Sequence, residues 1–185
     1  MKERGRGRRN LAGQLLLAHP ALKDPNFKRT VVLMSVNNKE GSLGVVLNRP
    51  LGKTLADYNR DFTFGPLAQV PVYRGGPVAT DQMLFVAWRW IAAEGAFQLQ
   101  FGLEPDKAGD VAAQKDYTLR AFLGYSGWSA GQLENEMKHN TWFVAPVDTD
   151  VIGTNDGVAL WRVVLGALDP ELKLLADEPE DPAVN

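Results

Sequence analysis

Short apolar runs separated by polar turns dominate the first two thirds of the chain, and each run has the length of a β-strand. Residues 13–18, 29–36 and 43–47 are runs of this kind, and the polar turn 37–42 between the last two predicts a hairpin. Five later segments also predict strands, at 71–74, 83–88, 96–101, 117–123 and 141–145.

Helix signals are fewer, and most of them lie in the second half of the chain. Thr54 can cap a short helix that ends near Arg60, and residues 105–115 carry a weaker helical pattern. Strands early and helices late indicate an α+β domain with a mixed, strongly curved sheet rather than a doubly wound parallel sheet. Residues 156–168 predict a final amphipathic helix, whose apolar face consists of Trp161, Val164, Leu165 and Leu168.

The run from Gly124 to Glu134 predicts an abrupt passage from the strand 117–123 into a helix. Ser129 and Gln132 have the spacing of a capping box, in which each side chain bonds the backbone N–H of the other residue. The glycines of the run allow a sharp turn or a close approach to another backbone, and they stand at positions 124, 127 and 131.

Two further signals support this helix and predict its end. Trp128 and Leu133 occupy the two positions of a hydrophobic staple around the cap. Lys138 and His139 suit the negative end of the helix, and Asn140 can adopt the left-handed conformation that ends one. The expected helix therefore ends at about residue 139.

The same run invites comparison with a nucleophile elbow, which places a serine in Gly-x-Ser-x-Gly between a strand and a helix. Around Ser126 the spacing is one residue short, and the chain has only His19 and His139 to act as a base. Tight packing by the glycines, with the tryptophan in the core, is therefore the favoured interpretation. A small-ligand or peptide site at the helix N-terminus is the alternative, because free amides there attract anions.

The composition is that of one globular domain, expected over residues 11–168, with 45% hydrophobic and 23% charged residues in a chain of 185. The absence of cysteine excludes disulfides, thiolate zinc sites and cysteine nucleophiles. No apolar run approaches a membrane span, and the basic segment 1–10 leads into no small-residue cleavage site, so we expect a cytoplasmic protein without membrane partners. Residues 1–10 read as a flexible basic arm and residues 169–185 as an acidic, proline-containing disordered tail.

Charge and motif spacing limit the possible functions further. The net charge is −2, and the basic residues concentrate in the arm, so direct DNA binding is possible through the arm but is not favoured by the charge of the domain. Asp148–Asp150 opens like a calcium loop, but the later ligand positions fail, and two isolated histidines give no metal spacing. We expect no metal and no cofactor.

Several motifs in a fixed order resemble the YqgE/AlgH family of bacterial proteins. They are Gly13–Ala18, Asp24–Phe27 with Arg29, Gly41–Pro50, Tyr73–Val78, Gly124–Glu134 and Asn140–Trp142. The resemblance implies a single α+β domain with a bifurcated, partly barrel-like sheet flanked by helices. Some members are labelled transcriptional regulators, and no catalytic motif is carried over. The family usually has alanine at the place of Ser126, which argues against a family nucleophile there.

The arginines at two strand ends are the remaining candidates for chemistry. Arg49 before Pro50, and Arg74 before Gly75 and Gly76, could bind a small anion, or could instead tie loops through backbone carbonyls or Asp81. We expect a non-enzymatic regulatory or interaction protein, with an anion-binding enzyme or ligand sensor and a DNA-binding regulator as alternatives. The candidate contact residues at exposed loop ends are Arg49, Arg74, Tyr125, Trp128 and Gln132.

Overall fold

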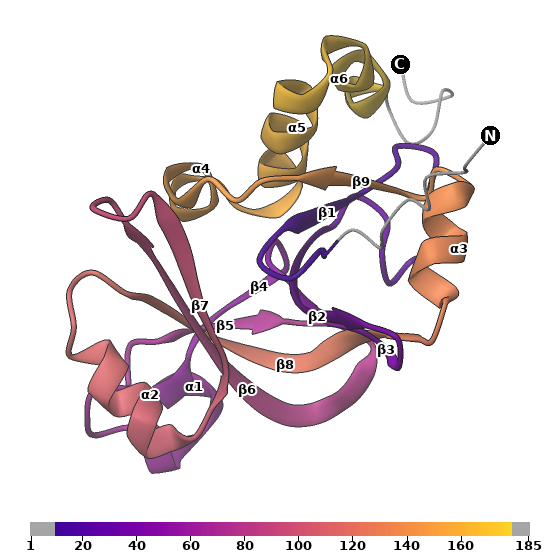
Figure 1. Ribbon diagram of the computed structural model, residues 1–185. Helices are drawn as coiled ribbons and strands as arrows, with labels where there is room; N and C mark the ends of the chain where they lie inside the picture. The colour runs from indigo at the N-terminus through magenta and orange to yellow at the C-terminus, as the bar shows by residue number, and fades with distance from the viewer. Residues whose placement is uncertain (1–9, 179–185) are drawn as a thin grey trace.

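The computed structural model describes residues 10–178, which form nine strands and six α-helices (Figure 1). The basic arm predicted for residues 1–10 lies outside the described residues except for Asn10, and so do residues 179–185. The strands are β1 (Leu15–Ala18), β2 (Val31–Asn38), β3 (Gly41–Val46), β4 (Pro50–Thr54), β5 (Pro71–Arg74), β6 (Val78–Ile91), β7 (Ala96–Leu103), β8 (Thr118–Ser129) and β9 (Trp142–Ala145). The helices are α1 (Leu55–Tyr58), α2 (Pro105–Ala112), α3 (Gln132–Lys138), α4 (Thr149–Thr154), α5 (Gly157–Leu168) and α6 (Pro170–Asp177), with a 3₁₀ turn at Arg60–Phe62.

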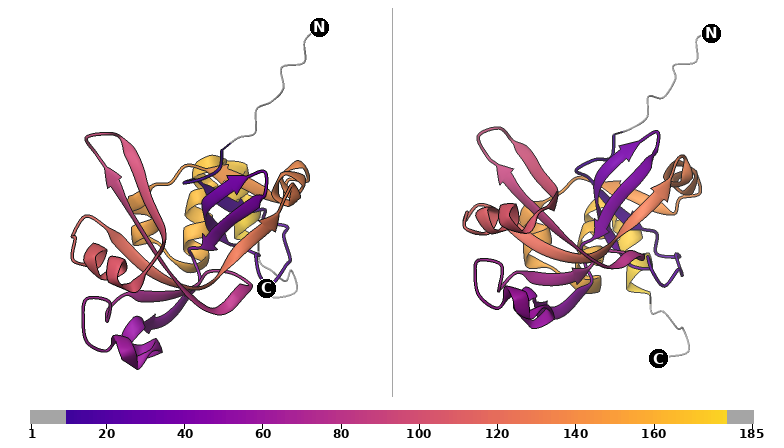
Figure 2. Two further views of the ribbon diagram at one scale, coloured as in Figure 1. Left: turned by 60° about the horizontal axis from the view of Figure 1, so that its bottom comes forward. Right: turned by 90° about the horizontal axis from the view of Figure 1, so that it is seen from below.

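All nine strands belong to one mixed sheet that forks along β8. The first half of β8 lies between β5, which is parallel to it, and β6, which is antiparallel, whereas its second half pairs with β3. From β3 the sheet continues through β2 and β1 to β9, while β7 extends β6 and β4 extends β5. The sheet curls into a half-barrel (Figure 2), which confirms the predicted α+β domain with a bifurcated, strongly curved sheet.

Three apolar clusters fill the spaces between the sheet and its helices. The largest packs the inner face of the curled sheet against α5, where the buried Trp161 donates its indole N–H to the Ala18 carbonyl at 2.9 Å. A second cluster lies between the sheet and α1 and α2, and a third lies beneath α3 around Trp128 and Trp142. In Figure 1, α1 and α2 lie at one end of the molecule and α3 lies at the other.

Two buried polar side chains tie the sheet to the segment around α4 and α5. The Asn48 amide oxygen accepts from the Val31 N–H, and its nitrogen donates to the Arg29 and Gly157 carbonyls, each bond being 2.9 Å long. Because every bond of this amide is made inside the protein, its burial costs little and it fixes the register of these segments. Asn48 is therefore a structural part of the Asn-Arg-Pro motif.

Arg120 on β8 is a buried cation that the sequence reasoning did not identify. Its guanidinium donates to the Leu47 and Ile152 carbonyls at 3.2 and 2.9 Å and lies over the Tyr73 and Trp88 rings. Burial lowers the pKa of Arg120, while the nearby Tyr73 and Asp156 oppose that shift. The two carbonyls and two rings replace the solvation that this charge loses in the core.

The expected turn after residue 123 is wrong, because β8 continues as a strand to Ser129. Gly124, with φ of 69°, kinks the strand, and beyond it Ser126 and Trp128 lie opposite Gly44 and Ser42 of β3. A sequence window cannot show that a second strand is available to pair with this segment, and that pairing decides the conformation.

Only one of the two hydrogen bonds of the predicted capping box at α3 is present. The Gln132 side chain accepts from the Ser129 N–H at 3.1 Å, but the residue at the N-cap is Gly131 in a left-handed conformation. The other end agrees with the prediction, since Asn140 has φ of 56° directly after the helix. The Thr54 cap of α1 is confirmed with a complete capping box to Asp57.

The remaining differences concern elements that the apolar pattern hides. β4 forms across Pro50 and Gly52, where the expected strand had ended, and β6 begins at Val78 rather than Met83. The segment considered as a calcium loop is the start of α4, whose N-cap is Asp148. Residues 170–177 form α6, packed on α5 with Ala176 buried, so the expectation of a disordered tail from residue 169 is wrong for that stretch.

Candidate functional site

Two of the predicted contact residues, Arg49 and Arg74, line one surface cavity of about 620 Å³ where the sheet forks. The Arg74 backbone N–H donates to the Arg49 carbonyl at 2.9 Å, so the last residue of β5 is a neighbour of the residue directly before β4. We call this space the fork cavity. Its other lining residues are Pro25, Asn26, Val46, Gly76, Pro77, Thr80 and Leu123.

Gly75, which follows Arg74, fixes the position of the chain at the point where the sheet forks. Its N–H donates to the Leu123 carbonyl at 2.8 Å, and its carbonyl accepts from the Val46 N–H at 2.9 Å and the Ser126 hydroxyl at 3.1 Å. The residue is thus wedged between β3 and β8. A Cβ atom here would lie 2.3 Å from the Gly124 carbonyl oxygen, so only glycine fits without a backbone shift.

The adjoining glycine and Ser126 have structural parts in the same contact. A Cβ atom on Gly76 would lie 2.2 Å from the Tyr125 backbone. Ser126 is fully buried, and its hydroxyl donates to the Gly75 carbonyl, with no histidine among its hydrogen-bond partners in residues 10–178. The structure therefore favours the packing interpretation of the glycines and gives Ser126 no features of a nucleophile.

Arg49 anchors a loop while facing the fork cavity. Its guanidinium is half-buried, and one terminal nitrogen donates to the Pro25 and Lys28 carbonyls at 3.0 and 3.4 Å. Burial lowers the pKa of Arg49, the positive charge of Arg74 lowers it further, and Asp24 opposes both effects. Arg49 thus fulfils the expectation that an arginine ties loops through backbone carbonyls.

Arg74 behaves differently, because its exposed guanidinium makes no hydrogen bond and no ion pair with any described residue. Asp81, considered as its partner, lines a separate cavity beside Tyr58. The backbone N–H of Gly76 also donates to no acceptor in the described part of the chain. The fork cavity therefore presents unused hydrogen-bond donors, to which the exposed Thr80 hydroxyl and Asn26 amide add.

The other three predicted contact residues lie away from the fork cavity. Trp128 lies in the core, as the packing interpretation expected, so its place among the exposed contact candidates is wrong; the residue is 5% exposed, and its indole N–H donates to Glu136 at 2.9 Å. Tyr125 is half-buried in a shallow groove between β3 and β8. Gln132 is exposed, but its side chain bonds the backbone of Ser129 and the carboxylate of Glu136. These three residues do not form a site with the arginines.

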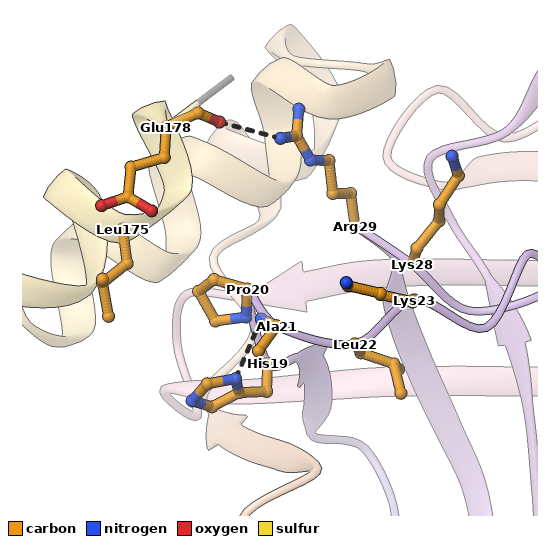
Figure 3. Close-up of a pocket in the computed structure, with 9 residues that line it drawn as sticks. All are labelled: His19, Pro20, Ala21, Leu22, Lys23, Lys28, Arg29, Leu175 and Glu178. Atoms are coloured by element: carbon orange, nitrogen blue, oxygen red, sulfur yellow. Dashed lines mark hydrogen bonds between the residues drawn. The ribbon is translucent and has the colours of Figure 1, made fainter. Parts of the chain in front are cut away.

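A second cavity, of about 500 Å³, lies between the loop after β1 and the end of α6 (Figure 3). Arg29, with φ of 54°, donates to the Glu178 carbonyl at 3.2 Å and lies over the Trp161 ring. His19 stacks on Phe143, and its Nδ1 accepts from a backbone N–H. Because the Arg29 guanidinium and His19 Nδ1 already bond within the protein, these two groups are weaker candidates for ligand contacts than the Arg74 guanidinium.

The sequence placed glycine amides beside Arg74, and Gly76 does line the fork cavity, but sequence reasoning missed two polar lining residues, Asn26 and Thr80. Asn26 and Gly76 do lie in recognised family motifs, but nothing local to either motif shows that the two segments meet. Among residues 10–178, no cluster of acidic and histidine side chains could hold a metal ion. In the same range, no helix has both the length and the apolar character needed to cross a membrane.

Comparison with known proteins extends over almost the whole chain. The profile of the AlgH-like family matches residues 15–173. A UPF0301 protein of Streptomyces coelicolor is 37% identical over 190 residues, covering 95% of this chain and 96% of that protein. The solution structure of the AlgH protein from Pseudomonas aeruginosa has 27% identity and a TM-score of 0.67, covering 98% of this chain and 100% of that one. The crystal structure of protein DIP2367 from Corynebacterium diphtheriae shares the fold, with 22% identity, a TM-score of 0.71 and coverage of 96% and 95%.

Proposed function

This chain belongs to the AlgH-like family, whose biochemical function is unsettled, and we propose that it is a non-enzymatic regulatory protein that binds a small anion in the fork cavity. The observation that carries the proposal is Arg74, an exposed residue that lines the cavity and whose guanidinium has no partner among residues 10–178. Arg74 lies beside Arg49, and the two positive charges repel each other. An anion between the two would remove this repulsion and would accept charge-assisted hydrogen bonds.

The lining residues support binding rather than catalysis. They supply guanidinium, amide and hydroxyl groups, but no imidazole, thiol or carboxylate that could act as a general base within the cavity. Thr80 carries the one hydroxyl among them, and no base accompanies it. An activated nucleophile needs such a neighbour.

A regulatory role follows from the two contacts of Arg49, one with the loop and one with the anion. The guanidinium that would contact the anion also holds the loop carbonyls of Pro25 and Lys28. An anion bound to the remaining N–H groups of this guanidinium would shift it relative to those carbonyls, so the loop would respond to occupancy. Such a response is how a binding protein can report its ligand to a partner, since differential contacts in two states are what shift an equilibrium. The absence of cysteine fits action in the cytoplasm.

Thermal unfolding in different anions tests the proposal. The full chain is heated in chloride, sulfate, phosphate or citrate at equal ionic strength. An anion at 100 times its Kd adds about 2.7 kcal/mol, which corresponds to roughly 5–10 °C in Tm for a chain of this size. Equal Tm values in all four anions would refute the proposal.

Two variants localise the effect to the fork cavity. Arg74→Gln should remove most of the anion-dependent rise in Tm, because it deletes the unpartnered cation. Arg60→Gln is the matched control, since Arg60 is also exposed, its replacement removes the same charge, and it does not line this cavity. Loss of the rise in both variants would indicate general charge screening and would also contradict the proposal.

A further inference from the structure

We infer that the ligand of the fork cavity carries a dianionic phosphomonoester group, an inference that rests on the proposed function and identifies its ligand class. The reasons are the number of donors at the cavity, their close spacing and their charge. Each distinguishes a phosphoryl group from the other common small anions.

The residues that carry the unused donors lie at neighbouring points of the backbone and line one cavity. Arg49 and Arg74 are joined by a backbone hydrogen bond of 2.9 Å, and Gly76 follows two residues after Arg74. One terminal nitrogen of Arg49 is occupied by loop carbonyls, which leaves its other N–H groups available. A phosphomonoester offers three terminal oxygens in a tetrahedral arrangement, whereas a carboxylate offers two in one plane. Three donors from three positions therefore suit a phosphoryl group better.

The charge of the cavity favours a dianion. Two guanidinium groups repel each other here, and Asp24 is the acidic group that partly balances Arg49. Asp24 does not line the cavity, so among the lining residues a monoanionic carboxylate or sulfate ester would leave one of the two cations without a counter-charge. A phosphomonoester carries close to two negative charges at pH 7 and would balance both.

The rest of the ligand has room but no aromatic platform. A cavity of about 620 Å³ is far larger than a phosphoryl group requires. Its apolar walls come from Pro25, Pro77, Val46 and Leu123, and none of the described residues that line it is aromatic. A nucleobase would find no ring to stack on. A phosphorylated aliphatic compound or a phosphorylated serine side chain fits this lining, and both present the same group.

The pH dependence of binding separates a phosphomonoester from other anions. Phenyl phosphate and phenyl sulfate have nearly the same shape, and only the phosphate gains a second charge, near pH 6. By calorimetry with the full chain, the Kd of phenyl phosphate should fall about tenfold between pH 5.0 and 7.5. Phenyl sulfate should change less than twofold. None of the described residues that line the cavity is a histidine, so no imidazole adds its own pH dependence in this range.

The Arg74→Gln variant should weaken phenyl phosphate binding at pH 7.5 at least tenfold, and Arg60→Gln should leave it within twofold. Phosphate binding without the pH dependence, or binding no tighter than that of phenyl sulfate, would overturn the inference. If citrate or sulfate raises the Tm through Arg74 and phenyl phosphate does not, the inference fails and the proposed function stands. If no anion binds, both fail.

The source of the phosphoryl group is distinguished with two further probes. Glycerol phosphate represents a free metabolite, and a short peptide with a central phosphoserine represents a modified protein. Peptide binding more than tenfold tighter than glycerol phosphate identifies a phosphorylated protein partner. Equal or weaker peptide binding identifies a small molecule, and Arg74-dependent binding of either probe supports the phosphomonoester assignment.

Discussion

Arg49 and Arg74 carry the same charge at one cavity, yet their replacement by glutamine should affect stability very differently. Arg49→Gln removes the hydrogen bonds to the Pro25 and Lys28 carbonyls, whose lengths are 3.0 and 3.4 Å. The second bond is at the long limit, so the loss amounts to little more than one charge-assisted bond. Such a bond contributes about 1.5–3 kcal/mol when buried. Because Arg49 is half-buried, we expect a cost of about 1–2 kcal/mol.

Arg74→Gln should change the free energy of unfolding by less than about 0.5 kcal/mol, as for other exposed positions. Its guanidinium makes no bond with the described residues, and its removal relieves the repulsion of Arg49. One kcal/mol corresponds to roughly 2–4 °C in Tm for this chain length. The expected losses are therefore about 2–8 °C for Arg49→Gln and less than about 2 °C for Arg74→Gln.

Urea unfolding and calorimetry in chloride buffer, free of phosphate and sulfate, measure both values. Polyvalent anions are excluded because a ligand that binds the native state would add its own stabilisation. Arg60→Gln reports the effect of losing one exposed positive charge elsewhere. A loss for Arg74→Gln as large as that for Arg49→Gln would refute the division of roles, because it would show that Arg74 is held by structural bonds.

Three further predictions concern the fork, the core and the arm. Gly75→Ala should cost several kcal/mol by forcing the β8 backbone away, whereas Gly153→Ala, in open space within α4, should be neutral or stabilising by about 0.5–1 kcal/mol; urea midpoints compare them. Burial raises the pKa of Tyr73, whose hydroxyl donates to Asp156 at 3.0 Å, so the stability that this group contributes below about pH 10 is lost as the pH rises through its folded-state pKa. Tyr73→Phe should therefore be about 1 kcal/mol less stable than the wild type at pH 8, with the gap closing above pH 10 in urea titrations. Any DNA binding should be weak, steeply salt-dependent and lost when residues 1–9 are removed, as fluorescence anisotropy on duplex DNA would measure; affinity unchanged by the deletion would contradict this.

Sequence alone predicted the elements whose signals are local. The hairpin around residues 37–42, the cap at Thr54, the stop at Asn140 and the helix after Asp156 all depend on residues within a few positions of each other. In such stretches the side-chain period, the cap and the turn residues agree. The family motifs also predicted the α+β class and the bifurcated sheet.

Sequence reasoning failed where a distant segment decided the conformation. The glycines after residue 123 are compatible with either a turn or a kinked strand, and only the presence of β3 alongside selects the strand. Leu168 was expected on the buried face of its helix but is 39% exposed, and it is the last residue of α5, directly before the N-cap of α6. Burial of a single residue at an element's end depends on neighbours that the periodicity does not contain.

The candidate site at the fork cavity also combines features that the local sequence predicts with features that distant segments decide. The sequence by itself determined that Arg49 and Arg74 each stand at a strand end beside a forced turn. Only the tertiary structure decided that they share one cavity, that the first is bonded to loop carbonyls and that the second has no partner among residues 10–178. The two arginines share this cavity because β3, β5 and β8 come together around Gly75. That approach is a contact between backbones far apart in the chain, and such contacts leave no periodic signal in the sequence.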